Sequence, residues 1–136
     1  HGPEQGIELF HGYTYSGHPV AAAAGLATLE VYREEGTFAQ ARELESIFAD
    51  ELHQFDHYPK VVDVRNIGLM GAIELEPRKG APGARGLEVH KHCFWEEDLV
   101  IRNNMDILQF SPFLNSRPTD LSDMFASVKR VIDKVA

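Results

Sequence analysis

Two short stretches of this chain combine residue types that bind anions. In the first, residues 10–19, two Tyr, a Thr and a Ser lie between Gly12 and Gly17 and lead into an alanine-rich segment that begins at Pro19. Hydroxyls and backbone N–H groups ahead of a helix N-terminus suit a phosphate group. The same composition is typical of an ordinary turn whose side chains bond only to their own loop. The segment is therefore a candidate phosphate site, with a plain turn as the alternative.

The second stretch contains Arg102. It follows the apolar run Leu99–Ile101, which we expect to form a strand, so the guanidinium should lie at a strand end or edge. A planar fork of donors is well suited to clamp a carboxylate with two parallel charge-assisted hydrogen bonds. The alternative is a solvated arginine at the end of a strand.

Other reactive residue types favour structural roles. His53 and His57 lie four residues apart, as in the His-Glu-x-x-His motif of zinc proteases. The Glu of that motif is absent here, so we expect no metal site. Cys93 lies in a helical pattern without an activating neighbour, which predicts a packed thiol. Gly68 and Gly71 flank the start of a predicted strand, where they should permit close backbone approach.

Length and composition limit the class of protein. The 136 residues amount to one domain, with 43% hydrophobic and 25% charged residues. A formal net charge of −8 argues against nucleic acid and anionic membrane surfaces as partners. No apolar run approaches the roughly 20 residues of a membrane span. The single cysteine forms no internal disulfide, which favours a reducing cytoplasm.

Hydrophobic periodicity predicts an α+β fold in two layers, with helices on one side of a small, largely antiparallel sheet. We expect helices over residues 18–35, 38–57, 85–97 and 119–135, and strands over residues 61–65, 69–75, 99–102 and 107–111.

Three stretches together resemble a known family. Residues 2–19, residues 63–75, and residues 100–102 with Ser111 and Pro112 are similar to the C-terminal part of class III pyridoxal-phosphate-dependent aminotransferases. The residues of these stretches are most similar to the branch that transfers amino groups from ω-amino acids such as β-alanine to pyruvate. The resemblance implies a fold-type-I homodimer with the cofactor at the subunit interface. It also implies a large domain that carries the Schiff-base lysine and a C-terminal small domain.

The resemblance assigns roles to three residues. The Thr14 hydroxyl and backbone N–H, with the Tyr13 N–H, would bind the phosphate of pyridoxal phosphate held mainly by the other subunit. Arg102 would bind the substrate carboxylate. Two departures affect the surroundings of Arg102, because Met105 replaces a usual Gly and Phe113 replaces a usual Pro.

The resemblance assigns no catalytic residue to this chain, since the Schiff-base lysine would lie outside it. We expect all five lysines on loops or polar helix faces: Lys60, Lys79, Lys91, Lys129 and Lys134.

The same resemblance predicts how the chain is organised. Residues 1–18 would belong to the large-domain interface, and residues 19–136 would form the small domain with its linking helix. The partners would be the chain's own large domain and a second subunit, with an amino donor and a keto acid as substrates. The start at His1, without Met, reads as a tag remnant joined to the interior of a longer protein. Alone, the piece should be catalytically silent.

Two alternatives stay open. Other class III enzymes share the architecture, among them the ornithine and 4-aminobutyrate aminotransferases and the glutamate semialdehyde aminomutase. The chain could also be a free-standing interaction domain without catalysis.

Overall fold

The computed structural model of the protein describes residues 12–135 and divides the chain into two compact units on either side of the Glu35–Gly36 bond. The first unit contains a turn and helix α1 (Pro19–Glu34). Proline suits the first position of a helix because its missing N–H would have no partner there. The His18 side chain caps the helix, since its Nδ1 accepts a hydrogen bond from the Ala21 N–H at 3.3 Å. The predicted helix is confirmed, and His18 is structural.

The second unit is an α+β domain, as the sequence predicts. Its elements are α2 (Thr37–His53), β1 (Val61–Ile67), β2 (Met70–Leu75), α3 (Ala84–Glu96), β3 (Arg102–Asn104), β4 (Ile107–Phe110) and α4 (Pro118–Val135). The four strands form one antiparallel sheet in the order β1-β2-β4-β3, so that β1 and β3 are its edges. Among residues 12–135, no helix has the length and apolar character needed to cross a membrane.

One predicted strand is wrong in its bounds. Residues 99–101 are not part of the sheet, and β3 begins only at Arg102. The Leu99 N–H bonds to the Cys93 carbonyl at the end of α3, and the Ile101 carbonyl accepts a hydrogen bond from the His90 ring at 2.8 Å. These residues therefore bond to α3 rather than to a neighbouring strand.

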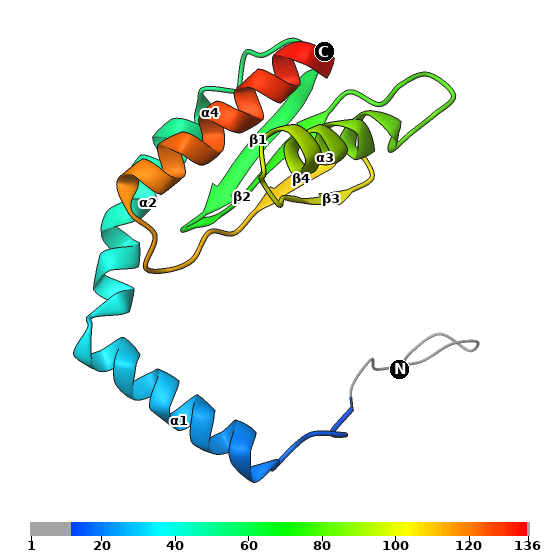
Figure 1. Ribbon diagram of the computed structural model, residues 1–136. Coiled ribbons are helices and arrows are strands. Elements are labelled where there is room, and N and C mark those ends of the chain that lie inside the picture. Colours follow the sequence, from blue (N-terminus) through cyan, green and yellow to red (C-terminus); the bar gives the residue numbers. More distant parts are fainter. Residues whose placement is uncertain (1–11, 136) are drawn as a thin grey trace, which may run out of the picture. The chain divides into compact units, whose positions relative to one another are not determined.

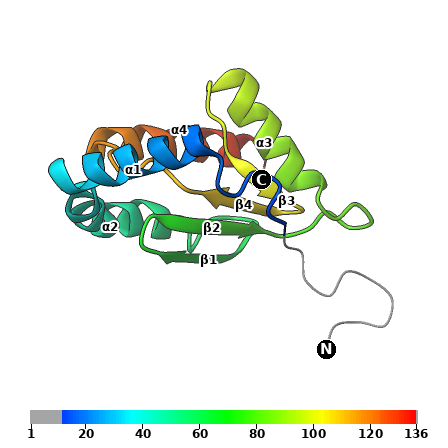
Figure 2. The same ribbon diagram turned by 90° about the horizontal axis from the view of Figure 1, so that it is seen from below.

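Helices α2, α3 and α4 cover one face of the sheet, which Figures 1 and 2 show from two directions. The core lies between these layers. At its centre, Phe125 of α4 packs against Phe48 of α2 and Phe110 of β4, with ring centroids 5.4 and 5.3 Å away. Along β2, Ile73 and Leu75 are buried in this core. Side chains of a strand alternate between faces, so the intervening residues point to the uncovered face of the sheet.

Gly71 explains how closely α2 approaches the sheet. A Cβ atom there would lie 2.6 Å from Leu52 Cδ2 and 2.8 Å from Phe48 Cε1. These distances are shorter than van der Waals contact, so only glycine fits without displacing the buried side chains of Leu52 and Phe48. The prediction of close approach is confirmed for Gly71. It is wrong for Gly68, where a Cβ atom would meet no atom within 4 Å and the glycine instead adopts the left-handed conformation at φ 55° between β1 and β2.

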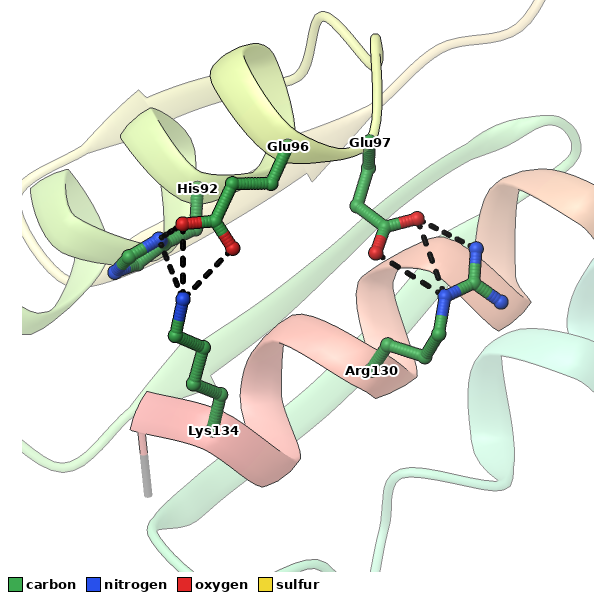
Figure 3. Close-up of polar contacts among 5 residues, drawn as sticks. All are labelled: His92, Glu96, Glu97, Arg130 and Lys134. Atoms are coloured by element: carbon green, nitrogen blue, oxygen red, sulfur yellow. Dashed lines mark hydrogen bonds and ion pairs between the residues drawn. The ribbon is translucent and has the colours of Figure 1, made fainter.

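Two ion-pair groups join α3 to α4 (Figure 3). The Lys134 Nζ donates to both carboxylate oxygens of Glu96 at 2.8 and 2.7 Å, and His92 Nδ1 lies 2.7 Å from the same carboxylate. Arg130 lies one turn before Lys134 on α4, and its guanidinium donates to both oxygens of Glu97. The carboxylates thus bridge the two helices at consecutive positions.

These bridges predict a pH dependence of stability. The hydrogen bond from Lys134, and then that from His92, lowers the pKa of Glu96 below its usual 4.5. The Arg130 guanidinium likewise lowers the pKa of Glu97. A carboxyl group with a lowered pKa in the folded state stabilises the fold above pH 4.5 and loses that contribution as the pH falls further. On acidification from about pH 6 to about pH 3, the free energy of unfolding should therefore fall less in E96Q/E97Q than in the wild type.

Urea unfolding measured across this pH range tests the prediction. The prediction would be contradicted if the free energy of unfolding of the wild type and of the double variant fell by the same amount over this pH range.

Candidate functional site

The uncovered face of the sheet aligns two arginines across all four strands. Arg65 of β1 pairs with Ala72 of β2, Ala72 with Gln109 of β4, and Gln109 with Arg102 of β3. Directly paired residues in neighbouring strands share a face. The row therefore places one guanidinium at each edge of the sheet, with a small and a polar side chain between them.

A hollow of about 530 Å³ lies over this row. Both arginines line it, and Ile67 and Met70 add exposed apolar surface at its floor. A mostly apolar hollow with a few polar groups has the lining that is typical of small-molecule sites.

The two arginines differ in their electrostatic state. The Arg65 guanidinium hydrogen-bonds to Asp63 and, at 3.1 Å, to Glu74. Both carboxylates raise the pKa of Arg65, and the hydrogen bond that Arg65 donates to Asp63 has the largest effect. In contrast, the exposed Arg102 guanidinium forms no hydrogen bond or ion pair with any residue from 12 to 135. Within the described chain, Arg102 is thus the arginine of this hollow that is available to bind an anion.

Gln109 is a site residue that the sequence analysis missed. It lies directly opposite Arg102, lines the same hollow, and its amide makes no hydrogen bond within residues 12–135. An amide N–H beside a guanidinium adds a donor for one bound carboxylate. The alternation of β4 was visible in the sequence, but the partner of Gln109 depends on strand register, which sequence alone does not fix.

The departure at Met105 leaves the turn intact. Met105 and Asp106 connect β3 to β4, with Met105 in the left-handed region at φ 55°. Glycine adopts this conformation without penalty, whereas other residues pay for contact between Cβ and the backbone. The hairpin thus forms with Met105 in place of glycine, with strain at this one residue.

Replacing Met105 with Gly should therefore raise the free energy of unfolding by about 1 kcal/mol, because it removes this strain. Asn104, whose φ is not positive, provides the matched control, and N104G should destabilise by about 0.5–1 kcal/mol. Denaturant titration of the two variants measures both changes. A loss of stability in M105G equal to that in N104G would contradict the prediction.

The first unit contains the predicted phosphate residues. A turn forms here, since the Ser16 N–H donates to the Tyr13 carbonyl at 3.0 Å and the His18 N–H to the Tyr15 carbonyl at 3.2 Å. Thr14 is exposed, and its hydroxyl makes no hydrogen bond to any residue from 12 to 135. An accessible hydroxyl in a turn fits an anion from outside the chain. His11, also considered in this segment, lies outside the described residues.

The remaining candidates have structural roles. Cys93 is fully buried, and burial raises the pKa of its thiol to about 11, so it is a packed side chain as predicted. The His53 ring contacts Asn66 at 3.0 Å and Asp56 at 3.2 Å. Within residues 12–135, no three side chains of His, Cys, Asp or Glu lie close enough together to hold a metal ion.

The lysines also lie where the sequence predicts. All five are exposed, and Lys60 and Lys134 form ion pairs with Glu76 and Glu96.

Comparison with known proteins gives the same family as the sequence motifs. The model of the family "Aminotransferase class-III" matches residues 2–132. The chain is 51% identical to an ω-aminotransferase of Caulobacter vibrioides and 40% identical to a β-alanine–pyruvate aminotransferase of Pseudomonas aeruginosa, in each case over 98% of this chain and 30% of the relative. It therefore spans about 30% of the length of these relatives.

Solved structures show the same fold. An ω-transaminase from Pseudomonas jessenii in complex with PMP matches 93% of this chain and 29% of its own, with a TM-score of 0.83 and 28% identity. Family match, sequence identity and fold thus agree over nearly the whole chain. The chain belongs to the class III aminotransferase family.

Proposed function

We propose that this chain is the C-terminal part of a pyridoxal-phosphate-dependent transaminase that moves an amino group from an ω-amino acid or amine, such as β-alanine, to pyruvate. The Arg102 guanidinium, which has no hydrogen-bond or ion-pair partner among residues 12–135, lines the apolar hollow and carries the proposal. It is complementary to the carboxylate that β-alanine and pyruvate share. The identities of 51% and 40% to an ω-aminotransferase and a β-alanine–pyruvate aminotransferase support this branch of the family.

In this proposal, the chain binds and orients while the rest of the parent protein supplies the reactive group. Arg102 holds the substrate carboxylate through two parallel hydrogen bonds, and the Gln109 amide adds a third donor from the neighbouring strand. The apolar floor of the hollow excludes water from the body of the substrate. Holding the carboxylate fixes the distance between the amino group and the reacting centre, which lowers the entropic part of the barrier.

Class III aminotransferases use pyridoxal phosphate, which supplies an electron sink for amino-group transfer. The residues of the first unit fit its phosphate, because the Thr14 hydroxyl is accessible and unbonded within residues 12–135. We assign the phosphate contact to this hydroxyl, to the Thr14 N–H and to the Tyr13 N–H, acting toward the cofactor of a second subunit in a homodimer. Residues 1–18 then belong functionally to the large-domain interface, and residues 19–136 to the small domain.

A related enzyme of the same family is the second candidate. The chain is 33% identical to a diaminobutyrate–2-oxoglutarate transaminase of Halomonas elongata and 33% identical to an ornithine aminotransferase of Staphylococcus carnosus. Both values are lower than the 40% and 41% identities to a β-alanine–pyruvate and an ω-amino acid–pyruvate aminotransferase, while a putrescine–pyruvate aminotransferase is 30% identical. Pyruvate is therefore favoured as the amino acceptor.

Kinetics of the full-length protein test the function. We expect a visible absorption band with pyridoxal phosphate and turnover of β-alanine with pyruvate, and much slower turnover with 2-oxoglutarate. T14A should weaken cofactor binding without changing the donor preference. The isolated chain should show no stable cofactor band and no turnover. Absence of amino transfer by the full-length protein would favour the interaction-domain alternative and refute the proposal.

A further inference from the structure

Helix α3 contacts the polypeptide on both sides of Arg102. Before Arg102, the His90 Nδ1 lies 2.8 Å from the Ile101 carbonyl oxygen. A carbonyl oxygen only accepts, so this ring nitrogen carries the proton and donates it. After Arg102, the carboxylate of Asp106 accepts hydrogen bonds from the N–H groups of Gly83 and Gly86. The strand that carries the guanidinium is thus attached to one helix at two points.

The Asp106 attachment is a buried, charge-assisted contact. Its side chain belongs to a residue only 4% exposed, with Oδ2 at 2.5 Å from the Gly83 nitrogen and Oδ1 at 2.9 Å from the Gly86 nitrogen. Helix α3 has no side-chain cap from its own N-cap residue and no acidic residue in its first turn. The carboxylate therefore satisfies N–H groups that the helix leaves open and lies at the positive end of the helix dipole.

The turn and the helix also touch through their backbones. A Cβ atom on Gly86 would lie 2.2 Å from the Met105 carbonyl oxygen and 2.8 Å from the Asp106 Cα. The Asp106 carbonyl in turn accepts a hydrogen bond from the Leu75 N–H at 2.9 Å. The β3–β4 turn is thus fixed between α3 and β2.

This attachment matters because β3 has little support of its own. It has three residues, lies at the sheet edge, and pairs with β4 alone. The Arg102 side chain contributes no hydrogen bond within residues 12–135 that would hold the strand. The position of the Arg102 backbone therefore depends on the anchors at Ile101 and Asp106.

We propose that His90 and Asp106 are positioning residues for Arg102, so that α3 sets how well the protein selects substrates with a carboxylate. The inference depends on the proposed role of Arg102 as carboxylate ligand. Binding groups work only when neighbouring residues hold them in the productive geometry, and a displacement of about 1 Å costs up to about a hundred-fold in rate. Loosening either anchor should weaken carboxylate binding while leaving the reaction of a donor without a carboxylate unchanged.

The amino-donor half-reaction of the full-length protein tests this inference, because pyruvate is absent from it. Single-turnover absorbance of the bound cofactor is followed with β-alanine and with 1-phenylethylamine, which has no carboxylate. Asp106→Asn and His90→Phe should each lower the ratio of limiting rate to apparent Kd for β-alanine about ten-fold, with the reaction of 1-phenylethylamine within about two-fold of wild type. His90→Gln keeps an N–H donor and should restore binding.

Glu97→Gln is the matched control, because it makes the same carboxylate-to-amide change at the opposite end of α3. It should leave the preference between the two donors unchanged. Equal losses with both donors in D106N and H90F, or no loss with either donor, would overturn the inference. If D106N does not fold, the comparison of H90F with H90Q alone tests the inference. A wild-type protein without amino transfer would instead refute the proposed function.

Discussion

Replacing Arg102 with Ala in the full-length protein should lower kcat/KM for β-alanine about a hundred-fold. Hydrogen bonds to charged groups contribute about 1.5–3 kcal/mol, and each 1.4 kcal/mol corresponds to a ten-fold change. In the donor half-reaction, 1-phenylethylamine should react within about three-fold of the wild-type rate, since it presents no carboxylate to the guanidinium. For Arg102→Lys, kcat/KM for β-alanine should lie between the values of the wild type and of Arg102→Ala, because lysine keeps the charge but lacks the planar fork.

Arg65 offers the matched control for this prediction. It lies in the same cross-strand row and lines the same hollow, but Asp63 and Glu74 already bind its guanidinium. Arg65→Ala should therefore leave the preference for β-alanine over 1-phenylethylamine unchanged. Loss of that preference in R65A, or its retention in R102A, would contradict the assignment of Arg102.

Phe125→Ala should reduce the free energy of unfolding of the chain by about 3–5 kcal/mol, the usual cost of deleting a buried aromatic ring. Phe125 is 2% exposed, and its ring packs against Phe48, Phe55 and Phe110, which come from three different segments. The cavity would therefore open where α2 and α4 meet the sheet. Urea unfolding followed by circular dichroism measures the loss.

Phe113→Ala removes the same ring from a surface position and controls for composition. Phe113 is 83% exposed, so the change should stay within about 0.5 kcal/mol. Similar losses in both variants would mean that the aromatic cluster does not hold the core together.

Local patterns account for most of what the sequence predicts correctly. Helices α2 and α4 show apolar spacings of three and four residues, and strands β1, β2 and β4 lie within or close to their predicted ranges. Such signals depend on neighbouring residues only. The error at residues 99–101 has a tertiary cause. The Ile101 carbonyl accepts a hydrogen bond from the His90 ring of α3, rather than one from a neighbouring strand.

The candidate site depends on contacts between distant residues. Arg102 was identified because its type and its place in a family motif are visible in sequence. Its alignment with Gln109 and Arg65 depends on the registers of three strand pairs. The role of Asp106 depends on hydrogen bonds across 20 and 23 positions of the chain. Neither the strand registers nor these separations of 20 and 23 residues correspond to a periodic pattern in the sequence.

The alternation along β2 has a consequence for how the substrate range of such an enzyme can evolve. At Gly71 the backbone presses against Leu52 and Phe48, so this position admits no larger side chain without loss of stability. Its neighbour Ala72 lines the hollow, on the opposite face of the strand. Mutations can thus reshape the proposed substrate surface at alternate residues while the core stays intact, which separates adaptability from stability within a single strand.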